Sequence, residues 1–268
     1  MTQKTLPQGI TSYDLLKTFA VVFMIIDHTG FFFYLEDNWW RVAGRLCVPV
    51  WFFLIGYARS RDTGSRLWIG ATVLICGNMI AGLHLLPLNI LFTMILIRLL
   101  LNPLMERSLR DVQTFWGINA LLFFLIIPTS MISEYGTLGI IMAMFGWLIR
   151  HQNELKNGQT LRNHYFAFAA LTFIATSYLT FGFNQNQGIL LAIGTFIVMR
   201  TLFLFQPMTF TGLSEKLPHP FVKLLHFTGR YTLEIYVLHL LLFYTIGLFT
   251  SPDRFSLFDW TLFYTAKE

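Results

Sequence analysis

An ionisable pair inside the first long apolar stretch limits what this chain can fold into. From Leu15 to Tyr34 about twenty mostly apolar residues follow one another, long enough for a helix to cross a bilayer. Asp27 and His28 lie well inside this stretch. An ionised side chain at the centre of such a helix costs roughly 2.5–3.5 kcal/mol on insertion scales. Both side chains therefore need partners inside the protein or a water-filled cavity.

Helical spacing places several polar residues of this stretch on one face. The face contains, at intervals of three and four residues, Asp14, Lys17, Val21, Met24 and His28. Lys17 and His28 are separated by ~16 Å along a helix that rises ~1.5 Å per residue. In one interpretation the face lines a polar tunnel, with a phosphate-bearing donor at Lys17 and chemistry at His28. In the other, Lys17 snorkels to the membrane surface, and Asp27 and His28 only pair with neighbouring helices.

Composition indicates a membrane protein. The 268 residues are 55% hydrophobic and 12% charged, with a mean hydropathy of +0.58, whereas soluble domains have about 25% charged residues. We therefore expect an all-α fold, a polytopic integral membrane helical bundle forming a single domain over residues 1–268. The net charge of +5 comes without a basic run, so no nucleic-acid partner is expected. The spacing of the His and Cys residues predicts no metal site.

Nine apolar segments predict about nine transmembrane helices, in a range of eight to ten. They cover approximately residues 15–34, 45–58, 67–84, 88–101, 114–130, 135–149, 164–182, 188–206 and 225–249. The shortest of them are either tilted or re-entrant. The basic loops all fall on the cytoplasmic side if the N-terminus is cytoplasmic, as the positive-inside rule requires. These loops contain Lys4, Arg59, Arg61, Arg66, Arg107, Arg110, Arg150, Lys156, Arg162, Lys216 and Lys223.

The second apolar segment brings a buried cation next to a helix breaker. Pro49 cannot donate a hydrogen bond to the carbonyl of Arg45, four residues earlier, so the helix should kink there. If the N-terminus is cytoplasmic, Arg45 enters the membrane at a depth similar to that of Asp27. Pairing would lower the burial cost of both groups. The alternative is that Arg45 snorkels to the outer headgroups.

Other polar residues are weaker site candidates. Asn89 lies in or beside an outer turn, and Arg98 would reach either lipid headgroups or a cofactor phosphate. Tyr236 and His239 share one face of the last apolar segment, and His239 is either a functional group or an interhelical hydrogen-bond partner. The stretch Glu134–Gly136 is interpreted as residues that pack against the bundle and belong to an outer loop.

Two motifs cover most of the first two apolar segments, namely DLLKTFAVVFMIIDHTGFFF and AGRLCVPVWFFLIGY. They resemble the TraX family, which includes the pilin acetylase of F-type conjugation systems. Similar stretches are LNILF at Leu88–Phe92, EYGTLGIIMAMF at Glu134–Phe145 and YTLEIYVLHLLLF at Tyr231–Phe243. The family is similar in turn to the acyltransferase-three membrane enzymes, whose first helix carries an Arg, then ten residues, then a catalytic His. In this chain Lys17 and His28 fill that spacing.

The resemblance implies a transferase of the bacterial inner membrane, in contact with membrane lipid. It implies acetyl-CoA as the cytoplasmic donor and an acceptor reached from the outer side, which for pilin acetylases is the N-terminal amine of the processed pilin. Lys17, with Asp14 and Arg98, would hold the nucleotide end of the donor. Lys17 is a point charge where the related enzymes have a bidentate Arg, so phosphate binding is less securely transferred than catalysis.

Acyl transfer needs a base and charge stabilisation for the tetrahedral oxyanion. We expect His28 to be the base. Asp27 would either adjust the orientation or basicity of His28 or hold Arg45. Adjacent helix residues diverge by ~100°, so we favour the Asp27–Arg45 pair. Arg45 would shape the site or face the acyl carbonyl.

Three other functions stay open. A transporter would use Asp27, His28, Arg45 and His239 as a proton or substrate relay, although no inverted repeat is evident. A non-catalytic assembly factor would hold an apolar pilin helix without acyl-CoA turnover. A related enzyme would acetylate a hydroxyl of a lipid-linked or surface glycan.

Overall fold

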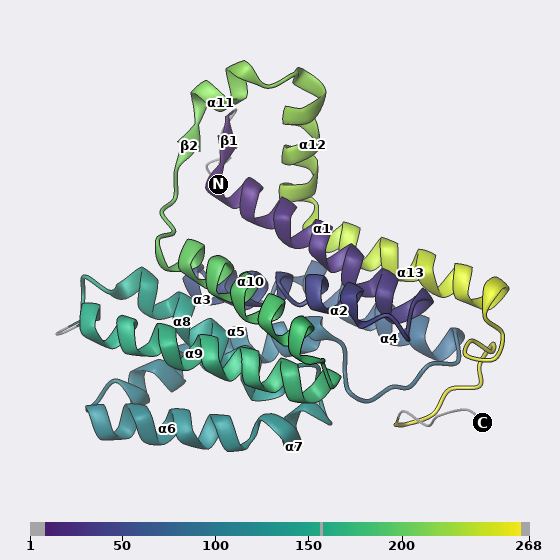
Figure 1. The fold of residues 1–268 in the computed structure, drawn as a ribbon, viewed down its shortest axis with the longest axis horizontal. Helices are drawn as coiled ribbons and strands as arrows, with labels where there is room; N and C mark the ends of the chain where they lie inside the picture. The colour runs from purple at the N-terminus through teal and green to yellow at the C-terminus, as the bar shows by residue number, and fades with distance from the viewer. Residues whose placement is uncertain (1–8, 156–157, 264–268) are drawn as a thin grey trace.

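The computed structural model describes residues 9–155 and 158–263 and shows an all-α protein (Figure 1). Lys4 and Lys156, two of the residues behind the predicted orientation, lie outside these ranges. The first eight helices are α1 (Ser12–Phe33), α2 (Asn38–Gly44), α3 (Cys47–Tyr57), α4 (Ser65–Ile80), α5 (Ile90–Ser108), α6 (Val112–Phe124), α7 (Ile126–Ser130) and α8 (Gly136–His151). The others are α9 (Gly158–Phe181), α10 (Gln185–Phe203), α11 (Thr211–Lys216), α12 (His219–Arg230) and α13 (Thr232–Thr250). Two short strands, β1 (Ile10–Thr11) and β2 (Thr209–Phe210), pair antiparallel.

Each predicted apolar segment contains helix, but the helices differ in length. Among the described residues, four are long and apolar enough to cross a membrane, namely α1, α9, α10 and α13. The all-helical prediction is therefore confirmed, and these helices identify a membrane protein. The count of nine spans and the cytoplasmic N-terminus stay predictions, because several helices are shorter than a bilayer requires.

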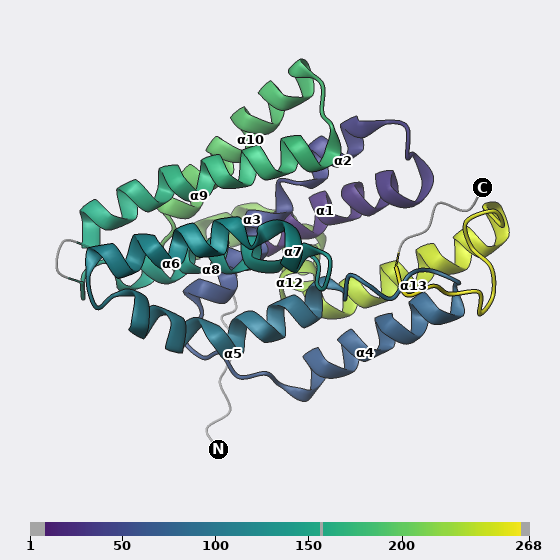
Figure 2. The ribbon, with the colours of Figure 1, turned by 90° about the horizontal axis from the view of Figure 1, so that it is seen from below.

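The centre of the bundle is formed by α1, α3 and α8 (Figures 1 and 2). The backbones of α3 and α8 touch because glycine faces backbone on both helices. A Cβ atom at Gly56 would collide with the carbonyl of Ala143, and one at Gly146 would collide with the carbonyl of Phe53. On one side α13 packs against α1 and α4, and on the other α9 packs against α8 and α10.

The predicted break near Pro49 is present. Helix α2 ends at Gly44 and α3 begins at Cys47, so Arg45 lies between two helices. The Arg45 carbonyl, which Pro49 cannot reach as a donor, accepts a hydrogen bond from the backbone N–H of Val48 at 3.2 Å. This break turns the Arg45 side chain into the bundle, where it is buried.

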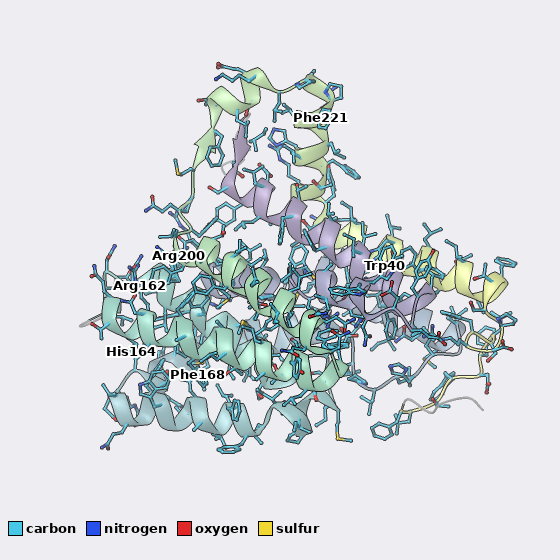
Figure 3. All side chains as sticks on the ribbon, viewed as in Figure 1. Trp40, Arg162, His164, Phe168, Arg200 and Phe221 are labelled. Carbon is cyan, nitrogen blue, oxygen red and sulfur yellow. The ribbon has the colours of Figure 1, made fainter. Side chains whose placement is uncertain are left out.

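Basic side chains from two predicted cytoplasmic loops come close to one another. Arg61 donates to the Asn102 side chain of α5 at 2.7 Å, and Arg150 donates to the Tyr57 carbonyl of α3 at 2.8 Å. The two guanidiniums also interact electrostatically. Arg162 and Arg200 lie near one another at an edge of the bundle (Figure 3). The cytoplasmic position of these loops stays a prediction.

The last described segment covers the end of the bundle where α1 finishes. Leu85 and Leu86 donate backbone hydrogen bonds to Thr261 and Leu262 at 3.0 and 2.8 Å. Arg254 donates to the carbonyl of Phe32, near the C-terminus of α1, at 3.0 Å. The segment after α13 therefore ties α1 and the α4–α5 connection together.

Candidate active site

A cavity of about 610 Å³ runs along the face of α1 that the helical spacing predicts. Lys17, Met24 and His28 all line it, together with residues of α3, α4, α5 and α13. Because Lys17 precedes His28 by about three helical turns, the two residues lie toward opposite ends of the cavity. We call the Lys17 end the mouth and the His28 end the deep end.

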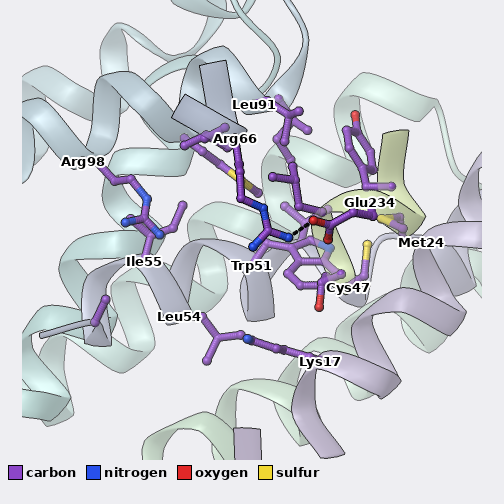
Figure 4. A pocket seen from close by; sticks show the side chains of 18 of the residues that line it. Lys17, Met24, Cys47, Trp51, Leu54, Ile55, Arg66, Leu91, Arg98 and Glu234 are labelled. Atoms are coloured by element: carbon purple, nitrogen blue, oxygen red, sulfur yellow. Dashed lines mark ion pairs between the residues drawn. The ribbon is translucent and has the colours of Figure 1, made fainter. Parts of the chain in front are cut away.

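Four cations line the mouth. They are Lys17, Arg66, Arg98 and Arg230. Arg66 is exposed and forms an ion pair with Glu234 of α13 (Figure 4). The Arg98 guanidinium donates to the Asp62 carbonyl at 3.2 Å, and both residues line the cavity. In the two described ranges the Lys17 ammonium makes no hydrogen bond or ion pair, so it is available to an anion entering the cavity.

The deep end contains a buried charge network centred on Asp27. Arg45 binds both carboxylate oxygens of Asp27, with its Nε at 3.1 Å from Oδ1. Arg41 donates to Oδ2 and to the backbone carbonyl of Asp27, both at 2.9 Å. The predicted Asp27–Arg45 pair is therefore confirmed, and Arg41 of α2 joins it. A bidentate guanidinium fixes the carboxylate in both position and orientation.

Tyr135 brings a hydroxyl group to this network. Its oxygen accepts a hydrogen bond from Arg45 at 2.8 Å, and the residue lines the cavity. Tyr135 adopts a φ of 66° and the following Gly136 a φ of 43°. Two successive left-handed residues turn the chain sharply before α8. Burial raises the pKa of Tyr135, so its hydroxyl keeps a proton that it can donate into the cavity.

Glu134, one residue earlier, also lines the cavity. Its Oε2 accepts a hydrogen bond from the backbone N–H of Ile90 at 3.0 Å, and its carbonyl accepts one from Thr93 at 2.7 Å. Burial raises the pKa of the Glu134 carboxyl to about 7, because desolvation outweighs the attraction of Arg45. The stretch does lie in a loop, between α7 and α8, but its interpretation as packing is wrong, since Glu134 and Tyr135 both line the cavity.

The two histidines predicted on α1 and α13 meet at the deep end. His28 Nδ1 lies 2.7 Å from His239 Nε2, and the rings stack with centroids 4.9 Å apart. His239 Nδ1 lies 2.8 Å from the Ile235 carbonyl, which can only accept a hydrogen bond. His239 Nε2 therefore carries a lone pair, and His28 donates to it through Nδ1–H. The remaining nitrogen of His28, Nε2, then has its own lone pair, which is the form of a general base.

Other predicted site residues have structural contacts instead. Asp14 forms the capping box of α1 with Thr11, at 3.0 Å from the Thr11 backbone N–H. Asn89 caps α5 and donates to the Ala71 carbonyl at 3.0 Å. Neither residue is among those that line the cavity. Tyr236 does line it, with its ring 5.8 Å from that of His28.

Sequence reasoning did not identify several cavity residues as site residues. Glu134 and Tyr135 were assigned to packing and an outer loop, Arg66 was assigned only to a basic loop, and Arg41 was not singled out. One usable signal was present: an ionisable residue followed by Tyr-Gly directly before a buried apolar helix, a pattern that predicts a tight turn into the bundle. Within the described residues, no group of three or more His, Cys, Asp or Glu side chains is arranged to hold a metal ion.

Comparisons with known proteins give a consistent family assignment. A family model described as TraX protein matches residues 12–247. An uncharacterized protein of Rickettsia prowazekii (strain Madrid E) is 31% identical over 151 residues, 54% of this chain and 59% of that protein. Protein TraX of Escherichia coli is 32% identical over 85 residues, 30% of this chain and 34% of that protein. Both alignments cover less than two thirds of the relative's length. No solved structure matches this chain.

Proposed function

This chain belongs to the TraX family, and from that premise we propose that it is a membrane-embedded acetyltransferase. It would take an acetyl group from cytoplasmic acetyl-CoA and pass it to an acceptor on the outer side of the bacterial inner membrane. The acceptor that the resemblance implies is the N-terminal amine of a pilin, so the reaction is N-acetylation.

One observation carries the proposal: a single cavity has four cations at one end and a hydrogen-bonded histidine pair at the other. Lys17 and His28 stand about 16 Å apart on the same helix face. A long donor with phosphates at one end and a thioester at the other suits such a cavity. Phosphate oxygens would be met at the mouth by Lys17, Arg66, Arg98 and Arg230.

At the deep end, His28 has the tautomer that acyl transfer requires. Its Nε2 would take a proton from the attacking group and return it to the departing thiolate. His239 would act through His28, because it holds Nδ1–H and so keeps the lone pair on Nε2.

Tyr135 is the group best placed to stabilise the tetrahedral oxyanion. Arg45 donates to the Tyr135 oxygen, which polarises the hydroxyl and leaves its proton free to bind the developing negative charge. All three nitrogens of Arg45 already donate to Asp27 or Tyr135. It would therefore shape the site rather than contact the acyl carbonyl.

The test compares purified wild-type protein with His28→Ala in detergent, using acetyl-CoA labelled in the acetyl group. The control is His164→Ala, which removes an exposed histidine of α9 at the periphery of the bundle (Figure 3). A positioned general base contributes about 10²–10⁴-fold to the rate, so His28→Ala should reduce CoA release or protein labelling by that factor. His164→Ala should leave it unchanged, and both variants should unfold at the wild-type temperature.

Retained turnover in a folded His28→Ala protein would contradict the assignment of the base. Absence of acetyl-CoA binding to the wild type would contradict the enzyme proposal itself and favour a transporter or a non-catalytic assembly factor. Transfer to a glycan hydroxyl but not to an amine would keep the enzyme and replace the acceptor.

A further inference from the structure

The cavity has four carboxylates, and they differ in what binds them. Asp27 is held by two guanidiniums, and Glu234 is paired with Arg66. Asp62 lies at the exposed mouth, hydrogen-bonded to Ser60. The carboxylate of Glu134 accepts its hydrogen bond from a neutral backbone N–H, that of Ile90, and no ion pair to it occurs among the described residues. Glu134 is thus the deep-end carboxylate without a bound cation.

The stoichiometry of acetyl transfer to an amine calls for two proton acceptors. An N-terminal amine has a pKa of about 7.7–8.0, so much of it enters as an ammonium. One proton must leave before the nitrogen lone pair can attack the thioester carbon. After the C–N bond forms and the C–S bond breaks, a second proton leaves nitrogen and the sulfur gains one. The balance is one amide, one CoA thiol and one released proton. A hydroxyl acceptor releases none.

His28 accounts for only one of these transfers, because the proton it takes from nitrogen is the one it returns to sulfur. We propose that Glu134 accepts the other proton, the one an ammonium acceptor loses before attack, so that this site is built for amines rather than hydroxyls. This inference rests on the proposed function and adds a catalytic residue to it.

The surroundings of Glu134 suit this role. The titratable and charged groups that act on it electrostatically come from α1, α2, the α2–α3 connection, its own loop and α13. They are Asp27, Arg41, Arg45, Tyr135, Tyr236 and Tyr244. With Asp27 and Glu134 both ionised, the two carboxylates and the two guanidiniums have no net charge, while burial still favours the protonated form of Glu134.

The proton affinity of Glu134 matches that of the acceptor. A carboxyl with a pKa of about 7 takes a proton from an ammonium of pKa about 7.7–8.0 at nearly no free-energy cost. An ordinary Glu, with a pKa of about 4.3, would be a much weaker acceptor. Glu134 and His28 both line the cavity. Glu134 also acts electrostatically on Tyr236, whose ring is 5.8 Å from that of His28, so both proton acceptors face one cavity.

The experiment uses the full chain in detergent with Glu134→Gln. Glutamine can still accept the Ile90 hydrogen bond but cannot accept a proton. The matched control is Glu106→Gln, an exposed glutamate of α5. The probe acceptors are a synthetic transmembrane peptide with a free N-terminal amine and the same peptide with that amine replaced by a hydroxyl. Acetyl transfer is measured for both from about pH 6 to pH 9, together with acetyl-CoA hydrolysis.

Wild type should acetylate the amine peptide at a nearly constant rate down to about pH 7. The Glu134→Gln variant can use only acceptor amine that is already neutral when it binds. Its rate of acetyl transfer should therefore fall about tenfold for each pH unit below about 8. At about pH 9 the two proteins should converge, since the amine is then already neutral. Transfer to the hydroxyl peptide and hydrolysis should be the same in wild type, Glu134→Gln and Glu106→Gln.

Two results would overturn the inference while leaving the enzyme in place. One is a pH profile of Glu134→Gln that does not indicate a proton acceptor. The profile could be identical to that of wild type, or the transfer rate could fall by the same factor at every pH with both peptides, which indicates a packing role. The other is a wild type that acetylates only the hydroxyl peptide. A wild type with no His28-dependent CoA release would instead overturn the proposed function, so the two failures are distinguishable.

Discussion

The two ends of the cavity use arginine in opposite ways. At the mouth, Arg66 is exposed and has one partner, Glu234, and Arg98 contacts one backbone carbonyl. At the deep end, Arg45 is buried and all its nitrogens are bound by Asp27 and Tyr135. Arg41 is bound to the same carboxylate. The mouth therefore has cations that can exchange partners, and the deep end has cations that cannot.

This difference separates reversible binding from preorganisation. An ion pair exposed to water contributes about 0–1 kcal/mol, so a phosphate can replace Glu234 on Arg66 at little cost. A buried charge left without its partner costs several kcal/mol, so the deep network keeps one arrangement. Fixed dipoles of this kind are what electrostatic catalysis requires, because they need no rearrangement when charge develops.

The largest expected effect comes from breaking the deep network. Asp27→Ala leaves the Arg41 and Arg45 guanidiniums buried without their carboxylate, and removal of one partner of a buried pair costs about 3–5 kcal/mol. We expect a clear fall in the unfolding temperature in detergent. Asp253→Ala, which removes an exposed carboxylate, should leave that temperature unchanged. Equal unfolding temperatures for the two variants would show that the deep network does not stabilise the protein.

The next effect concerns the histidine pair. His239→Leu removes the acceptor for His28 Nδ1–H, and a hydrogen bond worth about 1–1.5 kcal/mol corresponds to about a tenfold lower kcat. His239→Gln offers a side-chain oxygen in its place and should recover part of this loss. The KM for acetyl-CoA should stay constant in both variants, as measured by steady-state CoA release. A changed KM with constant kcat would place His239 in donor binding instead.

The smallest effect is expected at the mouth. Lys17→Gln removes one charge from the proposed donor site, and we expect the KM for acetyl-CoA to rise about three- to tenfold, with kcat unchanged. Lys17→Arg keeps the charge and should bind the donor at least as well. Raising the salt from about 0.05 to 0.5 M should weaken wild-type binding, since this end is open to counterions. A lower kcat with unchanged KM in Lys17→Gln would contradict the assignment of binding to the mouth and catalysis to the deep end.

Much of the deep end followed from local patterns in the first two apolar segments. Asp27 is an ionisable residue at membrane depth and Arg45 precedes a proline that must interrupt its helix. Both features predict an internal partner, and the two residues are close in sequence. The shared face of Lys17 and His28 followed from helical spacing alone. These predictions needed no knowledge of how distant helices pack.

The residues that were not predicted depend on distant packing or on helix capping. Glu134 and Tyr135 reach the cavity through a left-handed turn about one hundred residues after α1. His239 was a candidate, but its contact with His28 of α1 was not predicted. Hydrophobic periodicity does not say which helices become neighbours. Asn89 was misjudged for a local reason: an Asn directly before an apolar helix predicts an N-cap, and the structure uses it as one.

The shortness of α3 has a consequence for how the protein enters the bilayer. Its 11 residues span about 16 Å, roughly half of the ~30 Å hydrocarbon layer. It cannot be inserted as an independent span. Asp27 meets its guanidinium partners only 14 and 18 residues later in the chain, so α1 and α2 can leave the translocon together as a charge-compensated hairpin. Helix α3 would then enter the membrane beside a hairpin whose Asp27 charge is already neutralised by its guanidinium partners. This would happen before α8 has been synthesised.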